Sequence, residues 1–522
     1  MIRKAILLPI ATIFGVKNSS MKSILTIIVL INLVWTPVVS ARQSRAESAP
    51  ARRSLSNRHL AAEVRAEFLH AWNGYKKYAW GHDDLRPLTR TFHDWYAQSL
   101  LMTPVDALDT MILMGLTEEA DKTREYIVRN LSFDKDFEVQ NFEITIRLLG
   151  GLLSSYQLTG DERLLILATD LGTRLLPVFN SPTGLPYRYV NLRTGKVRDA
   201  KTNPAEAGTL LIEFGTLSKL AQRPIFYEKA KRALVAVYDH RSPIGLVGTW
   251  IDVETGKWID TDSHISGAID SYYEYLLKCW LLFGDEDCHR MWLASIAAIN
   301  KYLADPITRG IEIHNQTLNS GVMYGDYVEL WYGHAEMNTG QRTAQAYGAL
   351  DAFFPAVLAL SGDLDRARHL QDSSFKMWKQ HGIEPEEINY RTMEVREPGY
   401  PLRPEIVEST YYLYHYSLSR RRRAQTVLYR QMGQKLFDDF VKYCRTDEGY
   451  GALTSVITKE KADSMQSFVF AETFKYFYLL FASPSTLAFD QVIFNTEGHP
   501  LRRTWAGEKR SAPSHPRLAA RP

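Results

Sequence analysis

Three short segments with the same pattern constrain the fold of this chain most strongly. Apolar stretches end in LTGDERL at Gly160, in LFGDEDC at Gly284 and in LSGDLDR at Gly362. Each glycine suits the left-handed position that ends a helix, and the aspartate after it can cap the next helix. The unequal spacing excludes a short-period solenoid. We therefore expect helical hairpins, joined by long and varied loops, that close into a toroid around a central cavity.

Segments with helical periodicity fill the chain between about Leu60 and Pro500. Residues 60–80 are predicted to form an amphipathic helix, and the helices predicted to face the core are residues 105–116, 142–158, 206–220, 270–283 and 351–360. Residues 245–260 alternate like two strands around an ETGK turn. The chain has 522 residues, 45% of them hydrophobic, so it can bury a large core. No boundary interrupts it, and we expect one domain over residues 58–500.

The N-terminus has the pattern of a targeting segment. Met21 begins MKSILTIIVLINLVW, and the small residues of VVSA place a cleavage after Ala41. We expect residues 1–41 to be a signal peptide, with Met21 as the alternative start to Met1, and residues 42–57 to be a linker. The folded part would be exported, to the periplasm or the medium, with the endoplasmic reticulum lumen as the second choice. An uncleaved leader would be its only link to a membrane.

Charge and cysteine content exclude some classes of protein. The formal net charge of +3 is near balance for this length, so composition gives no argument for a nucleic-acid partner. Residues 501–522 are basic and proline-rich, which predicts a disordered tail. The three cysteines, Cys279, Cys288 and Cys444, do not form a disulfide framework; one bridge remains open and is not favoured. We expect a monomer.

Acids within apolar and aromatic helices point to a site. Glu472 lies inside SFVFAETFKYFYLLF, and Glu143 lies one helical turn from Arg147. A buried carboxylate costs several kcal/mol unless it is paired or coordinates a metal. An exposed ion pair or a helix-start acid would explain single members, but not the whole set. That set is Glu143, Asp270, Glu274, Glu405, Glu408, Glu472 and Glu497.

Two chemistries fit these acids. Calcium takes six to eight oxygen ligands from carboxylates, carbonyls, hydroxyls and water. Paired acids between aromatic walls also suit glycoside hydrolysis, in which one carboxyl protonates the leaving oxygen and another activates water or attacks. The sequence has no EF-hand loop, no HExxH and no paired cysteines for zinc. Aromatic residues make up 12% of the chain, which suits a carbohydrate site but is explained more simply by an aromatic core.

Five motifs, in order, resemble the class I α-1,2-mannosidases, glycoside hydrolase family 47. They are FEITIRLLGGLLSSYQLTGD, IDSYYEYLLK, PLRPEIVEST, FAETFKYFYLLF and FNTEGHP. The resemblance covers roughly Leu60 to Pro500. Within the family, DAFFPAVLALSGD and YPLRPEIVEST are closer to the ER-degradation-enhancing mannosidase-like proteins and to bacterial members.

The resemblance implies an all-α fold: an (α/α)7 barrel with β-hairpin insertions and a short C-terminal β segment that enters it. It implies a calcium-dependent, inverting exo-α-1,2-mannosidase acting on high-mannose N-glycans or related mannosides. Glu143 matches the general acid, acting through a water, Asp270 a second acid candidate, and Glu405 the general base. Thr496 matches the calcium ligand. The substrate-binding matches are Arg147, Glu213, Glu274, Arg403, Glu408, Phe468, Glu472 and Glu497.

The chain departs from the family at two positions. Gln466 stands where many members have an acid, and Ala268 stands where ER-type enzymes tend to have an arginine that contacts the oligosaccharide. The cysteine pair bridged in many eukaryotic members has no obvious counterpart. An alternative function is therefore a glycan-binding quality-control protein with weak or no hydrolase activity. A scaffold for a protein partner is a third. The intact catalytic matches favour the enzyme.

Overall fold

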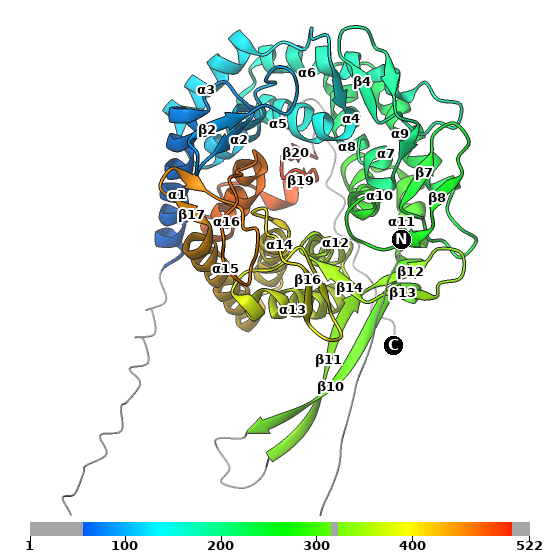
Figure 1. Ribbon diagram of the computed structural model, residues 1–522, viewed down its shortest axis with the longest axis vertical. Coiled ribbons are helices and arrows are strands. Elements are labelled where there is room, and N and C mark those ends of the chain that lie inside the picture. The colour runs from blue at the N-terminus through cyan, green and yellow to red at the C-terminus, as the bar shows by residue number, and fades with distance from the viewer. Residues whose placement is uncertain (1–55, 315–321, 504–522) are drawn as a thin grey trace, which may run out of the picture. The chain divides into compact units, whose positions relative to one another are not determined.

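Paired helices dominate the computed structural model, which describes residues 56–314 and 322–503 (Figure 1). The inner helices, which lie nearer the centre, are α2 (Met102–Leu113), α5 (Gly150–Thr159), α8 (Leu211–Leu220), α10 (Asp270–Phe283), α12 (Phe354–Ser361), α14 (Glu405–Ser419) and α16 (Phe474–Phe481). The outer helices are α1 (Asn57–Tyr78), α3 (Thr117–Asn130), α6 (Glu162–Leu175), α9 (Ile225–Asp239), α11 (Glu286–Tyr302), α13 (Leu364–His381) and α15 (Arg423–Cys444).

The inner helices contact one another in chain order. Contacts run from α2 to α5, α8, α10, α12, α14 and α16 in turn. The π-helical turn η4 (Val469–Thr473), which leads into α16, contacts α2 again. Each outer helix packs on the inner helix before it, and α1, at the start of the described chain, packs on α16. The described helices thus close on themselves.

Apolar patterning explains the two kinds of helix. Outer helix α6 buries Leu164, Ala168, Leu171 and Leu175, which recur at helical spacing on one face. Inner helix α12 is buried at every position from Phe354 to Ala359, because it packs on neighbours on several sides. A helix that is apolar all round belongs in the interior.

The predicted Gly-Asp turns are confirmed. Gly160, Gly284 and Gly362 follow α5, α10 and α12 with φ of 75°, 70° and 97°. The side chains of the next residues, Asp161, Asp285 and Asp363, accept backbone N–H bonds at the starts of α6, α11 and α13. The predicted helix over residues 206–220 is instead two helices, α7 (Pro204–Gly208) and α8, which are separated at residues 209–210.

Short antiparallel strands form part of the segments that connect the helices. They are β1 (Asp84–Arg86), β2 (Thr91–His93), β3 (Glu138–Gln140), β4 (Tyr189–Asn191), β5 (Val197–Arg198), β6 (Lys201–Thr202), β7 (Trp250–Asp252), β8 (Trp258–Asp260), β9 (Asp262–Ser263), β12 (His334–Glu336), β13 (Arg342–Ala344), β14 (Ala346–Gly348), β15 (Glu387–Asn389), β16 (Glu394–Glu397), β17 (Arg445–Thr446) and β18 (Gly449–Tyr450). The hairpin β7–β8 confirms the ETGK turn.

Two further hairpins differ in length and place. The strands β10 (Ala304–His314) and β11 (Val322–Tyr332) pair from Ala304 with Tyr332 to His314 with Val322 and extend away from the helices in Figure 1. The sequence analysis did not predict this hairpin. The strands β19 (Val492–Phe494) and β20 (Pro500–Arg502) contact α10 and α5 and lie among the inner helices (Figure 1).

The structure corrects two predicted boundaries. Asn57 begins α1 and Ser56 caps it, so the linker ends before residue 57. Leu501 and Arg502 belong to β20, so the fold continues past Pro500. The predicted signal peptide lies outside the described residues. In the part of the chain that the structure describes, no helix is long and apolar enough to cross a membrane.

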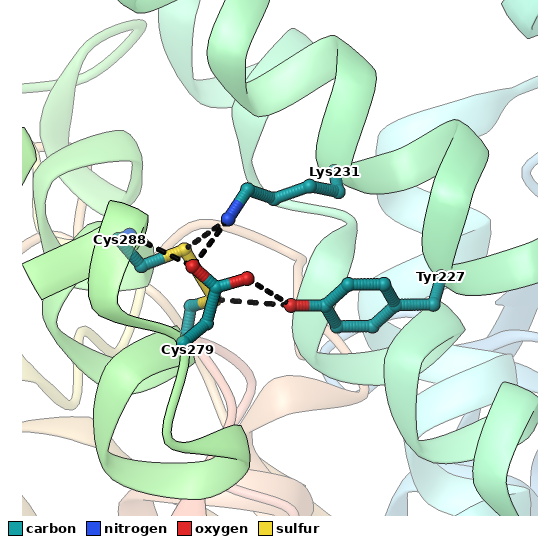
Figure 2. Close-up of a disulfide and its surroundings, with 5 residues drawn as sticks. Tyr227, Lys231, Cys279 and Cys288 are labelled. Carbon is teal, nitrogen blue, oxygen red and sulfur yellow. Dashed lines mark hydrogen bonds and ion pairs between the residues drawn. A yellow bond between two sulfur atoms is a disulfide. The ribbon is translucent and has the colours of Figure 1, made fainter.

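A disulfide joins Cys279 and Cys288, which corrects the expectation against a bridge (Figure 2). The tight turn at Gly284 brings the end of α10 beside the first turn of α11 and so places the two sulfur atoms together. Lys231 and Tyr227 of α9 point at the bridge in Figure 2. Cys444 is buried and free.

Candidate active site

One cavity of about 530 Å³ contains almost all of the predicted site residues. It lies where the inner helices begin, because Asp270 starts α10, Glu405 starts α14 and Glu143 lies in the short helix α4 (Asn141–Ile144). The predicted residues that line it are Glu143, Arg147, Asp270, Glu274, Arg403, Glu405, Glu408, Phe468, Glu472, Thr496 and Glu497.

Glu213 is the predicted site residue that does not line the cavity. It is fully buried on α8, where its Oε1 accepts hydrogen bonds from Tyr275 Oη at 2.6 Å and Asn495 Nδ2 at 2.8 Å. Burial raises the pKa of Glu213 to about 7. Glu213 is thus held by α10 and the β19–β20 turn outside the cavity lining, and its part in binding the substrate stays a prediction.

Arg147 joins three acids on one wall. Its Nε donates to Glu143 Oε2 at 2.9 Å, as the helical spacing predicted, and its Nη1 pairs with Glu497 and lies 3.7 Å from Asp106 Oδ2. Arg147 lies in the π-helical turn η1 (Thr145–Leu149), and such turns are frequent at functional sites. Its guanidinium also lies 5.7 Å from the Phe468 ring centroid, which brings a flat apolar surface to the same wall.

Like charges also crowd together among the other acids of the cavity. Glu274 pairs with Lys278 one turn along α10. Glu408 Oε1 accepts a hydrogen bond from Tyr476 Oη at 3.2 Å. Burial, with Glu274 and Glu405 nearby, raises the pKa of Glu408 although Lys278 opposes the shift. Burial and the acids around it raise the pKa of Glu472 well above its usual range.

Glu405 and Asp270 have the pKa values that suit proton transfer near neutral pH. Burial raises the pKa of Glu405 to about 7, against the opposing charge of Arg403. Its Oε2 is buried and has no hydrogen-bond partner among the residues that the structure describes. Burial raises the pKa of Asp270 to about 6, although Ser271 donates two hydrogen bonds to its Oδ1. Arg403 itself forms two bonds, of 2.9 and 2.8 Å, to Glu386.

The turn between β19 and β20 presents Thr496 to the cavity. Asn495 shapes this turn, since its Oδ1 accepts the backbone N–H groups of Glu497 and His499 at 3.0 and 2.8 Å. The turn packs closely on α5: a Cβ added to Gly150 would lie 2.5 Å from Asn495 Nδ2. The glycine pair at the start of α5 therefore permits this close approach.

A buried polar network supports the turn from below. His499 contacts Asp109 Oδ2 through Nδ1 at 2.8 Å and Asp106 Oδ1 through Nε2 at 3.3 Å. Lys475 Nζ lies 2.8 Å from Asp109 Oδ1 and donates to the Gly498 carbonyl at 2.7 Å. The two aspartates favour the charged imidazolium, and the pKa of His499 rises to about 9 despite its burial.

Sequence reasoning missed several of these supporting residues. Asp106 and Asp109 lie three apart in the apolar segment VDALDTM, the same signal that identified the other acids. Lys278 follows Glu274 by four residues and was equally visible. Glu386 carries no comparable signal, because it follows a loop rather than an apolar helix.

The residues around Thr496 fit a hard cation. The Thr496 hydroxyl and carbonyl are oxygen donors, and the acids nearby carry raised pKa values that a positive charge would relieve. Within the described residues, two groups of His, Cys or Asp side chains have ligand atoms within 4.8 Å of one another, and both lie outside the cavity lining. The pocket acids therefore do not form a tight direct cage, so water and substrate would complete the coordination.

Both departures from the family pattern lie in the cavity wall. Gln466 and Ala268 line it, and Ala268 has φ of 74°, an uncommon conformation for a residue with a side chain. Arg188, directly before β4, and Trp250, at the start of β7, also line the cavity.

A family comparison agrees with this arrangement. The model of glycosyl hydrolase family 47 matches residues 67–503. The chain belongs to this family. As a family 47 member it is a glycoside hydrolase.

Curated relatives of this family 47 chain include alpha-mannosidase I MNS5 of Arabidopsis thaliana. It is 34% identical over 477 residues, which cover 86% of this chain and 78% of the relative. The ER degradation-enhancing alpha-mannosidase-like protein 2 of Mus musculus is 35% identical over 485 residues, which cover 85% of this chain and 78% of that protein.

A solved structure of an alpha-1,2-mannosidase from Trichoderma reesei shares the fold. It superposes with a TM-score of 0.73 at 26% identity and covers 86% of this chain and 100% of that enzyme. Its fold is a barrel of α-helices, so this chain also has an α-barrel fold.

Proposed function

We propose that this family 47 chain is an exported, inverting exo-α-1,2-mannosidase that uses calcium and trims terminal α-1,2-linked mannose from high-mannose N-glycans or related mannosides. The closed succession of inner helices, each with an outer partner, supports an (α/α)7 barrel around the site. The observation that carries the proposal is the pair Glu405 and Asp270. Both line one cavity and have pKa values near neutrality.

Glu405 is the proposed general base. Its side chain lies in the cavity wall and is 13% exposed, so its carboxylate can accept a proton from the attacking water. A pKa of about 7 leaves Glu405 ionised in a large share of molecules at neutral pH. Arg403, 4.0 Å from Glu405 and anchored by Glu386, holds this side of the site in place.

Two residues are candidates for the general acid. Asp270 has a pKa raised to about 6, which keeps a useful fraction protonated below neutrality. Glu143 is more open, with 24% of its side chain exposed, and is paired with Arg147. This access to solvent suits a proton transfer through water. Inversion requires water on the face of the sugar opposite the leaving group.

Thr496 is the residue proposed to hold calcium, with Glu408, Glu472 and Glu497 holding waters around it. When bound, calcium supplies a positive charge and free coordination positions for sugar hydroxyls. The chain positions that site through Asn495 and the network below it. Phe468 offers the ring face on which a sugar can stack.

A glycan-binding quality-control role is the second candidate. It rests on the 35% identity to an ER degradation-enhancing alpha-mannosidase-like protein. In that case the same pocket would bind mannose without efficient hydrolysis. The site residues fit the enzyme better, because its base and both acid candidates are present in one cavity.

Replacing Glu405 with Gln tests the proposal. We expect mannose release from an α-1,2-mannobiose to fall at least roughly a thousandfold, while binding of a high-mannose glycan is retained. Glu329→Gln is the matched control, since that buried acid of β11 lies outside the cavity lining. A chain whose hydrolysis is unchanged by Glu405→Gln would contradict the assignment, and a wild type that binds but never hydrolyses would favour the second candidate.

A further inference from the structure

The turn between α14 and α15 departs from the pattern of the other helical hairpins. Three such turns have Gly-Asp, whereas this one has Arg421 and Arg422. Arg421 takes the left-handed conformation, with φ of 54°, that glycine occupies elsewhere. Arg422 occupies the N-cap position of α15 without a side-chain cap bond. This turn therefore lacks the glycine and the capping aspartate that stabilise the other three turns.

Four consecutive arginines, Arg420 to Arg423, are exposed at this turn. Throughout residues 56–314 and 322–503, no acid lies within ion-pair distance of any of the four. Cations at the start of a helix also oppose its dipole. Outer helices α3, α6, α11 and α13 carry acids in their first turns instead. Neither ion pairing nor helix stability accounts for these arginines.

Exposed apolar side chains flank the arginines. Leu418, Val427 and Leu428 are 38%, 52% and 44% exposed. Arg423 and Val427 lie one helical turn apart on the same face of α15. We call these three apolar residues and Arg420–Arg423 the α15 entry patch. Basic and large apolar side chains together are the combination that binds the interface of an anionic bilayer.

Both ends of the described chain lie beside the last turns of α14. Asn57 Nδ2 donates to Tyr414 Oη at 3.2 Å. Arg503 Nη1 donates a hydrogen bond to the backbone carbonyl of Asp490 at 3.4 Å. The preceding residue, Phe489, packs on Tyr416 of α14, with 5.8 Å between the ring centroids.

The segments that continue from these two ends are basic. Residues 42–56 contain four arginines and one acid, Glu47. Residues 504–522 contain Lys509, three arginines and one acid, Glu508. Both segments attach to the domain beside the patch.

We propose that this end of the domain docks on an anionic lipid bilayer through the α15 entry patch. α14 runs from Glu405 in the cavity to Ser419 beside the patch, a length of roughly 21 Å. A docked molecule therefore keeps its cavity at the far end of α14 from the lipid. The first turns of α6 and α11 carry acids, which an anionic bilayer repels, so the contact is limited to the side of the domain that carries the patch. The exposed apolar residues favour a bilayer over a soluble polyanion.

A fluorophore sensitive to polarity tests the contact in the full chain. It is attached at Leu428→Cys or, as a control near the cavity, at Ile259→Cys on β8, which is 55% exposed. The native cysteines do not compete, since two form the disulfide and the third is buried. With vesicles of phosphatidylcholine and phosphatidylglycerol we expect a blue shift at position 428 and none at 259. Vesicles of phosphatidylcholine alone should give no shift.

The variant Arg421→Gly/Arg422→Asp restores the Gly-Asp pattern and so separates docking from folding. We expect it to unfold at a higher temperature, to hydrolyse a small mannoside as the wild type does, and to bind the anionic vesicles at least roughly tenfold more weakly. Equal shifts at both labelled positions, or a shift that survives in this variant, would overturn the proposal. Unchanged vesicle binding by Val427→Ser/Leu428→Ser would also overturn it, because the apolar side chains of the α15 entry patch would then take no part in the contact.

Discussion

At the scale of single residues, the pH dependence of catalysis reports on Glu405 and Asp270. Glu405 must be ionised and has a pKa of about 7, while Asp270 as the acid must be protonated and has a pKa of about 6. We expect kcat/KM to follow a narrow bell with limbs near these two values. Asp270→Asn should leave a single limb that rises through about pH 7 or slightly below, because the variant loses a negative charge near Glu405. A falling limb that persists would assign the acid to Glu143.

Gly150 sets the position of the residue proposed to hold calcium. A methyl group there would lie 2.5 Å from Asn495 Nδ2 and push away the turn that carries Thr496. We expect Gly150→Ala to destabilise the fold by about 1–3 kcal/mol and to weaken calcium binding. Gly399→Ala is the control, since its nearest neighbour would be at an ordinary 3.6 Å. Thermal unfolding and calcium titration measure both, and equal effects in the two variants would contradict the account.

At the scale of elements, the Cys279–Cys288 bridge stabilises one helical hairpin without entering the site. Asp270 lies nine residues before Cys279, roughly 14 Å along α10. We expect Cys279→Ser/Cys288→Ser to cost roughly 2–3 kcal/mol of stability and to leave kcat/KM within a factor of two. Thermal unfolding under oxidising conditions and steady-state kinetics measure the two effects. A large loss of activity at full stability would show that the bridge positions α10.

The elements also show which parts of the fold the sequence could predict. Gly284 and Asp285 predicted a turn correctly, because both act through local backbone conformation. The β10–β11 hairpin and the disulfide were missed, since strand pairing and sulfur contact depend on neighbours in space. The partners of Glu213 were missed for the same reason. Its helix was predicted, but the sequence does not show that its carboxylate bonds to Asn495 of the β19–β20 turn.

At the scale of the whole molecule, the buried acids make stability depend on pH. Glu213 and Glu405 titrate near pH 7 when folded, against a usual value of 4.5. Between these values the folded state binds more protons than the unfolded state, so the free energy of unfolding falls as pH rises. We expect the metal-free chain to lose thermal stability from about pH 4.5 to about pH 7 and calcium to restore part of it. A melting temperature that rises steadily over this range would contradict the burial of these acids.

The measurement that tests the central claim most directly is the anomeric form of the mannose released from an α-1,2-linked mannobiose, followed by NMR with calcium and with EDTA. The account predicts β-mannose as the first product, at a rate that EDTA abolishes and added calcium recovers. Release of α-mannose would contradict inversion by Glu405 and its acid partner. Release that continues unchanged in EDTA would contradict the calcium site at Thr496.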